Sequence, residues 1–183
     1  CLHARAELSH NRPTPPAASL YPEPTRATKE HPLSSTDVLA PVEGRAVALA
    51  DVPDPVFAGG MVGYGAAIDP PHRVIQAVAP VSGTILKLLP HAYVIMTADN
   101  VGVLVHLGLD TVQLQGAGFT PHVAQGDAVS AGQPVITYDV PAIVAAGYNP
   151  VVPVVVMDER EPANVAVSEA VSSGGSIDSG ATL

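Results

Sequence analysis

The sequence predicts an all-β fold: a β-sandwich or flattened barrel of short antiparallel strands, built from a duplicated motif, with at most short helical turns. Hydrophobic residues make up 47% of the chain but aromatic residues only 4%, so the core must consist mainly of Val, Ala, Leu and Ile, which favours strands. Short apolar runs separated by Gly, Pro and Asp extend from Thr36 to Met157. With 19 Pro and 16 Gly in 183 residues, long helices are not expected.

Residues 1–36 differ from the rest of the chain. They are rich in Pro, Ser, Thr and charge and show no apolar period, which predicts a disordered tail or an interdomain linker. The only cysteine is Cys1, which excludes an intramolecular disulfide and fits a reducing, cytoplasmic compartment. Because the chain begins with Cys1 and not Met, we interpret it as a fragment or a gene-model error, with a lipidated Cys1 as the alternative.

An internal repeat organises the predicted β domain, residues 37–183. The segment APVEGRAV at 40–47 recurs as APVSGTIL at 79–86. A second, weaker repeat consists of glycine and aliphatic residues that alternate at intervals of three residues. It matches Gly126, Val129, Gly132 and Val135 with Gly174, Ile177, Gly180 and Leu183. Together they predict a duplicated unit with tight glycine turns, and a closing strand within residues 159–183. One short helix is expected at 141–147, after a capping Asp139 and ending on Gly147.

Charge narrows the choice of partner. The net charge is −9, and residues 37–158 alone hold ten acidic and three basic side chains. Phosphate backbones are bound by Lys and Arg, so nucleic acid is not expected as a partner. A basic protein partner or simple solubility suits this charge equally well. No run of about 18 apolar residues is present, so we expect no membrane span.

Two histidines lie in apolar runs that read as strands. His106 lies within VGVLVHLGLDTVQL (101–114), and His91 begins HAYVIMTAD. By strand alternation, His91 would share a face with Tyr93 and Ile95. The same rule places Leu104 and Gly108 on the face of His106, and it places Val105, Leu107 and Leu109 on the other. An imidazole in such a run costs free energy unless it is hydrogen-bonded or has a chemical role.

The chemistry that fits these residues is phosphoryl transfer through histidine. Neutral imidazole is a good nucleophile near pH 7 and accepts a phosphoryl group on a ring nitrogen. His106 would be the nucleophile, His91 a hydrogen-bond donor to the phosphoryl oxygens, and Gly108 an opening beside the phosphate. From spacing alone, two structural histidines satisfied by the backbone are an equal alternative. Asp54 is by default a turn aspartate before proline, and Asp110 a strand-end cap.

Five stretches resemble the enzyme IIA domain of the glucose family, in the bacterial phosphoenolpyruvate-dependent sugar phosphotransferase system, in a form typical of actinobacteria. They are APVEGRAVALADVPDPVFAGGMVGYGAAIDP, APVSGTILKL, HAYVI, GVLVHLGLDTVQLQGAGF and GDAVSAGQPVITYD. They follow the family's order within the span from about Asp37 to Met157, which is about two thirds of the chain. The resemblance implies a β-sandwich that takes phosphate from the small carrier protein HPr and passes it to the IIB domain of a sugar permease. The sugar would be glucose or N-acetylglucosamine.

The resemblance also implies roles for single residues. His106 would be phosphorylated through Nε2, with His91 as its hydrogen-bonding neighbour. Asp54 and Asp110 would form an acidic rim that meets arginine on the carrier. The family's apolar docking surface would consist of Val56, Phe57, Leu107, Leu109 and Val112. The family has a Thr two residues before the second histidine, where this chain has Leu89, and its N-terminal amphipathic helix is interrupted here by prolines.

Three other functions are weighed. His106 and Asp110 fit the His-x-x-x-Asp motif of lysostaphin-type zinc endopeptidases, but no later His-x-His supplies the third ligand. We therefore expect that no cofactor is required, with zinc at His91 and His106 as the alternative. A lipoyl- or biotinyl-type carrier domain would need its lysine at the tip of a hairpin, whereas Lys87 lies inside a Leu-rich run that is predicted to be a strand. A purely regulatory binding role is the third.

Overall fold

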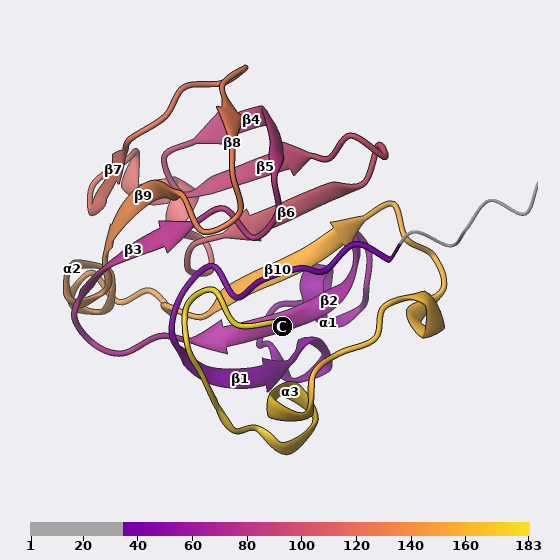
Figure 1. Ribbon diagram of the computed structural model, residues 1–183. Coiled ribbons are helices and arrows are strands. Elements are labelled where there is room, and N and C mark those ends of the chain that lie inside the picture. The colour runs from indigo at the N-terminus through magenta and orange to yellow at the C-terminus, as the bar shows by residue number, and fades with distance from the viewer. Residues whose placement is uncertain (1–34) are drawn as a thin grey trace, which may run out of the picture. The chain divides into compact units, whose positions relative to one another are not determined.

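The computed structural model describes residues 35–183, so residues 1–34 of the predicted tail lie outside it. Every strand pairing within the described part is antiparallel, as predicted. The larger sheet has eight strands in the order β11 (Ser176–Ile177), β1 (Gly44–Ala48), β2 (Gly63–Asp69), β10 (Val152–Met157), β6 (Gly102–His106), β5 (Ala92–Met96), β4 (Gly83–Leu89) and β8 (Ala128–Val129). The second sheet has the order β3 (Val74–Val78), β9 (Pro134–Asp139), β7 (Phe119–Pro121). Figure 1 shows the larger sheet curving from β1 and β2 through β10 to β6, β5 and β4, with β3, β9 and β7 beside it. The predicted all-β class is confirmed.

The core lies in two clusters of buried side chains. The main cluster contains the largest buried side chains, among them Tyr93, Tyr138 and Ile68. The second is smaller and consists of Leu49, Val52, Phe57, Ala67, Leu109, Val151 and Val155. Strand β10 separates the two, because Val152 and Val154 pack in the main cluster and Val155 in the second. Both of its faces are covered, which explains the unbroken apolar run in its sequence.

The predicted duplication is present in the backbone. Gly44 of β1 pairs with Ile177 of β11, and Gly83 of β4 pairs with Val129 of β8. The second repeat in the sequence therefore supplies the outer strand of each copy, β11 beside β1 and β8 beside β4. Glycine is needed at both inner positions, since a Cβ on Gly44 or Gly83 would lie 2.2 Å from a backbone oxygen of the neighbouring strand.

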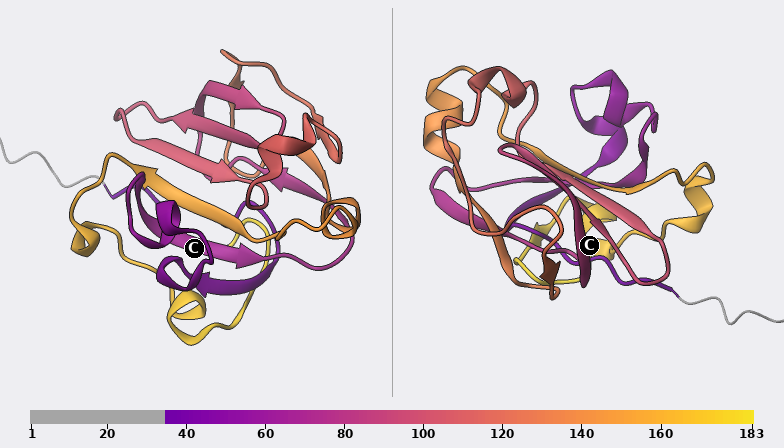
Figure 2. Two further views of the ribbon diagram at one scale, coloured as in Figure 1. Left: turned by 180° about the vertical axis from the view of Figure 1, so that it is seen from behind. Right: turned by 90° about the horizontal axis from the view of Figure 1, so that it is seen from above.

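The helical segments are short. The predicted helix is α2 (Val140–Ala145), whose N-terminus is capped by Asp139 through a 3.0 Å bond from the backbone N–H of Ala142. Two helices of four and five residues, α1 (Pro55–Ala58) and α3 (Glu169–Ser173), have no counterpart in the sequence prediction. Their length is too short for an apolar period to show. The 3₁₀ turns are η1 (Leu49–Asp51), η2 (Thr111–Leu114) and η3 (Pro162–Asn164). Figure 2 shows α1 standing out from the face of the larger sheet.

None of the helices in the described part of the chain is long and apolar enough to cross a membrane.

Candidate active site

The β5–β6 pair brings the two histidines together. His106 is the last residue of β6 and pairs with Ala92, the first residue of β5. The next backbone bond in the ladder runs from the N–H of Leu107 to the carbonyl of His91, at 2.7 Å. As a result the two imidazole rings meet edge to face, with their centroids 5.1 Å apart. The prediction that these two histidines form one site is consistent with this geometry, although His91 lies in the turn before β5 and not within a strand.

The hydrogen bond of His106 determines which ring nitrogen is nucleophilic. Nδ1 lies 2.7 Å from the backbone carbonyl oxygen of Gly108. A carbonyl oxygen only accepts hydrogen bonds, so Nδ1 must carry the proton. In the neutral ring the lone pair is then on Nε2. The backbone thus presents Nε2, not Nδ1, to an incoming electrophile.

Burial keeps both rings neutral near pH 7. For His91, which is only 8% exposed, burial lowers the pKa below 6.5, and the neighbouring His106 lowers it further. For His106, burial again lowers the pKa, while its bond to Gly108 and the carboxylates of Asp54 and Asp110 partly oppose that effect. The net direction is downward for both, so the nucleophilic form is the resting form.

Helix α1 forms one wall of the site. The Asp54 carboxylate accepts hydrogen bonds from the backbone N–H groups of Val56 at 2.8 Å and Phe57 at 3.3 Å, which starts the helix. This helix carries the Phe57 ring to an edge-on contact with His106, with centroids 5.5 Å apart. Asp54 therefore caps α1 and also lowers the energy of a positive ring on His106.

Gly108 lies differently from the prediction. We expected it to leave space beside the phosphate, but it is buried and its N–H donates to the carbonyl of Val151 at 3.1 Å. Its carbonyl faces Nδ1 of His106, and Nε2 is the other ring nitrogen. Its φ of +79° is in the region that favours glycine, and it turns the chain back toward the ring.

This turn also breaks the strand alternation. Val105 and Leu107 point into the main core as predicted, whereas Leu109 packs in the second cluster, on the side of Leu104. The prediction that Leu109 shares the face of Leu107 is wrong, because φ at Gly108 reverses the direction of the chain.

The five apolar residues assigned to docking fall into two groups. Val56 and Val112 are 41% and 59% exposed, so both are available to a partner. Leu107 is fully buried and cannot line a docking surface, which corrects the expectation for that residue. Leu109 and Phe57 are almost fully buried and support the surface from below. The sequence reasoning did not select Met61, which follows α1 and is 68% exposed.

Asp110 is exposed, and its backbone has a φ of +57°. Its side chain makes no capping hydrogen bond to η2, the 3₁₀ turn that follows it. The neighbouring Thr111 is fully buried, and its hydroxyl donates to the carbonyl of Leu107 at 2.8 Å. Sequence reasoning did not assign Thr111 to the site, because no pattern shows that its hydroxyl returns to the backbone beside His106.

The donor set does not form a metal site. Zinc in a catalytic site takes three protein ligands, and within residues 35–183 no three His, Cys, Asp or Glu side chains are grouped to hold a metal. His91 and His106 supply two nitrogens, and Nδ1 of His106 is already bonded to a carbonyl. The residues present therefore do not fit the zinc endopeptidase alternative.

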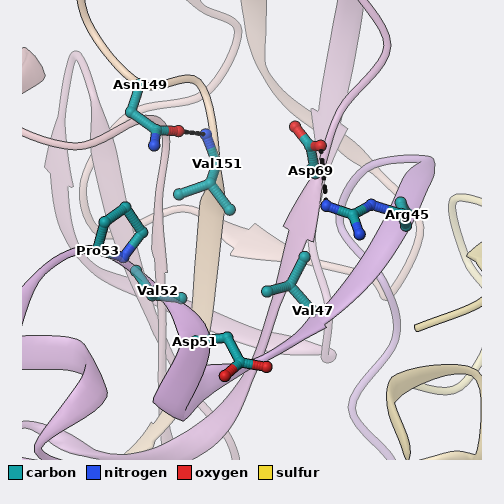
Figure 3. Close-up of a pocket in the computed structure, with 8 residues that line it drawn as sticks. All are labelled: Arg45, Val47, Asp51, Val52, Pro53, Asp69, Asn149 and Val151. Atoms are coloured by element: carbon teal, nitrogen blue, oxygen red, sulfur yellow. Dashed lines mark hydrogen bonds and ion pairs between the residues drawn. The ribbon is translucent and has the colours of Figure 1, made fainter. Parts of the chain in front are cut away.

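A pocket of about 170 Å³ lies elsewhere, between η1, the β1–β2 pair and the segment 149–151. Figure 3 shows its wall, where Arg45 forms an ion pair with Asp69 at 3.6 Å and Asn149 bonds to the N–H of Val151. Neither histidine lines it. The histidine pair thus lies outside this pocket.

Comparisons with known proteins agree with this geometry. Residues 36–161 match the family described as phosphoenolpyruvate-dependent sugar phosphotransferase system, EIIA 1. The chain is 35% identical to the PTS system glucose-specific EIIA component of Oceanobacillus iheyensis, over 77% of the chain and 87% of that protein. It is 42% identical to the PTS system mannose-specific EIIBCA component of Corynebacterium glutamicum, over 66% of the chain but only 18% of that longer protein. Among solved structures, glucose permease IIA from Mycoplasma capricolum matches with a TM-score of 0.61 and 37% identity, over 66% of this chain and 78% of that one.

Proposed function

The chain belongs to the EIIA 1 family of the phosphoenolpyruvate-dependent sugar phosphotransferase system, and on that premise we propose that His106 is its phosphoryl-carrying residue. The predicted family and its phosphotransferase class are confirmed. In this role Nε2 of His106 accepts a phosphoryl group from phospho-HPr and passes it to the IIB domain of a sugar permease. The zinc endopeptidase alternative finds no support among the relatives.

The observation that carries the proposal is the 2.7 Å bond between Nδ1 of His106 and the carbonyl of Gly108. In the transfer step the Nε2 lone pair attacks phosphorus. The new N–P bond forms as the N–P bond to the donor histidine breaks, and the donor ring leaves with that electron pair. The His106 ring keeps its Nδ1 proton and gains positive charge. The Gly108 carbonyl and the carboxylates of Asp54 and Asp110 already favour a positive ring, so they stabilise this product.

His91 is suited to hold the transferred group. Within the described part of the chain, no side-chain hydrogen bond occupies its ring nitrogens, while its backbone carbonyl is held by Leu107. A neutral imidazole has one N–H to donate, and the phosphoryl oxygens would lie beside it. We expect this bond to orient the phosphoryl group for the next in-line transfer to the IIB domain.

The surface around the pair suits a basic partner. Asp54 and Asp110 flank His106, and the exposed apolar side chains Val56, Met61 and Val112 lie on α1, just after it and on η2. A weak interface with charge steering would allow rapid capture and release, as a relay requires. The chemistry needs no cofactor beyond the two proteins. We place the domain in the cytoplasm with its donor, and we assign the choice of sugar to the permease.

Labelled phosphoenolpyruvate, with enzyme I and HPr, tests the assignment. The parent chain should take up an acid-labile, alkali-stable label, whereas His106→Ala should take up none, because the nucleophile is absent. His122→Ala is the matched control, since His122 is exposed and bonds Thr137 in another part of the fold. Full labelling of the His106→Ala chain would refute the proposal.

The role of His91 is tested by the onward step. We expect His91→Ala to accept label from phospho-HPr and to pass it to a IIB domain about 100-fold more slowly, since the nucleophile remains while its partner is lost. Single-turnover transfer from the isolated phosphorylated variant measures this. Onward transfer at the parent rate would assign His91 a structural role only.

A further inference from the structure

We infer that Thr111 is a positioning residue for phosphoryl transfer: its buried hydroxyl holds the backbone that selects the reactive tautomer of His106. This inference rests on the proposed role of His106 and deepens it. Thr111 is fully buried, and apart from the tyrosines, His91 and Thr111 are the only buried residues with a polar side chain among residues 35–183. A buried hydroxyl must find a partner, and this one donates to the carbonyl oxygen of Leu107 at 2.8 Å.

The peptide unit between Leu107 and Gly108 is held at both ends. Its carbonyl accepts from Thr111, and its N–H donates to the carbonyl of Val151 at 3.1 Å. A peptide unit is planar, so two bonds in opposite directions define its orientation. Removing the Thr111 bond would leave this plane free to rotate about its other anchor.

The following peptide unit holds His106. The carbonyl of Gly108 accepts from Nδ1 of His106 at 2.7 Å, and the N–H of Leu109 donates to the carbonyl of Asn149 at 2.8 Å. The two units share the Cα of Gly108, whose φ is +79°. Rotation of the first unit would therefore move the carbonyl that meets the ring.

The methyl group of Thr111 has a separate role. A Cβ on Gly108 would lie 2.6 Å from Cγ2 of Thr111, so this methyl closely covers the Gly108 backbone. Thr111 thus contacts the turn in two ways, by packing through its methyl and by a hydrogen bond through its hydroxyl. A matched pair of variants separates the two contributions.

The tautomer of His106 depends on this arrangement. A neutral imidazole in water favours the form with the proton on Nε2, which has no lone pair on that atom for attack. The carbonyl of Gly108 reverses this preference by accepting from Nδ1. Thr111 acts on that carbonyl through the backbone, because its hydroxyl bonds to the carbonyl of Leu107 and not to the imidazole.

Thr111→Val and Thr111→Ser provide the test. Valine keeps the methyl and removes the hydroxyl, whereas serine keeps the hydroxyl and removes the methyl. Thr97→Val is the control, because Thr97 accepts a bond from the N–H of Val101 in the turn at the opposite end of the β5–β6 pair. The ¹⁵N chemical shifts of the His106 ring at pH 8 report the tautomer of the unphosphorylated protein, and rapid mixing with phospho-HPr reports the rate of acceptance.

We expect Thr111→Val to populate the Nε2–H tautomer and to accept phosphate about tenfold more slowly, a loss typical of removing a residue that orients a functional histidine. Thr111→Ser keeps the hydroxyl, so it should retain the tautomer of the parent protein. Thr97→Val should also leave the tautomer unchanged. The inference is overturned if Thr111→Val keeps both the parent tautomer and the parent rate, or if serine loses as much as valine.

Two further outcomes are decisive. If Thr111→Val does not fold, Thr111→Ala, which introduces no added bulk, is compared with Thr111→Ser by the same two measurements. If the parent protein carries no label on His106, the proposed function fails. The tautomer comparison, made without phosphate, then still decides whether the hydroxyl orients the ring.

Discussion

At the scale of single residues, the site is defined by how one imidazole is held. His106 has its Nδ1 proton bonded to a backbone carbonyl and its ring partly buried against His91 and Phe57. Burial makes the ring neutral, while the carbonyl and the nearby carboxylates favour a positive one. These opposing effects suit a nucleophile that must be neutral before transfer and cationic after it.

These pKa shifts predict a dependence of stability on pH. The pKa values of both His91 and His106 are lower in the folded protein than their ordinary 6.5. Between the lowered values and 6.5 the unfolded chain binds more protons, so the contribution of both groups is complete above 6.5 and is lost as pH falls through that window. The loss amounts to about 1.4 kcal/mol for each unit by which a pKa is lowered.

Urea unfolding at pH 7.5, 6.5 and 5.5 measures this effect. The parent chain should lose more free energy of unfolding across this range than the double variant His91→Gln, His106→Gln, in which neither side chain titrates. Parallel losses in the two proteins would show that other groups cause the acid sensitivity.

At the scale of elements, the turn after β6 connects the sheet to the chemistry. Strand register alone brings His91 beside His106, but the turn at Gly108 returns the backbone to Nδ1 and directs Leu109 into the second cluster. The turn is held in place by Thr111 and by the segment that leads into β10. The backbone conformation of this turn is therefore fixed by hydrogen bonds to other parts of the fold.

Gly108→Ala tests how tightly this turn is built. A Cβ would face both an unfavourable φ and the methyl of Thr111, so we expect a loss of about 2–4 kcal/mol in the free energy of unfolding, with slower phosphoryl acceptance. Gly132→Ala is the control: its φ is +83° but nothing lies within 4 Å of the added Cβ, so we expect about 1 kcal/mol and normal acceptance. Equal losses in both variants would contradict the role of packing at Gly108.

At the scale of the whole molecule, the duplicated fold builds the sheet, and we expect the acidic charge to affect encounter with a partner. Most of the acidic excess lies within the β domain, since residues 37–158 hold ten acidic and three basic side chains, and Asp110 is an exposed acidic side chain near His106. Charge of this kind acts at a distance and mainly affects the rate of encounter.

Asp110→Lys should therefore slow capture of phosphate from HPr several-fold at low ionic strength, where the Debye length is about 10 Å or more. The difference from the parent should largely vanish near 1 M salt, where that length is about 3 Å. Asp99→Lys changes the net charge by the same amount but lies in the turn at the far end of the β5–β6 pair, so it should have little effect. Slowing that does not depend on salt would argue against steering.

Local patterns in the sequence were sufficient for the all-β class, the duplicated unit, the short helix after Asp139 and the pairing of His91 with His106. Each of these depends on side-chain periodicity, on a repeat or on a turn residue, and all three are visible along the chain. The family resemblance added the proposed role of His106.

The resemblance implied Nε2 of His106, but only the tertiary structure gave the physical reason for that nitrogen, the directions of Leu107 and Leu109, and the bond from Thr111 to the turn. These features depend on one backbone angle at Gly108 and on carbonyl groups of Asn149 and Val151, about forty residues further along the chain. Every residue except proline offers the same backbone donor and acceptor, so hydrogen bonds between backbone groups cannot be read from the residue types. A sequence therefore shows which side chains are available for chemistry, whereas the packed backbone determines which atom of each one reacts.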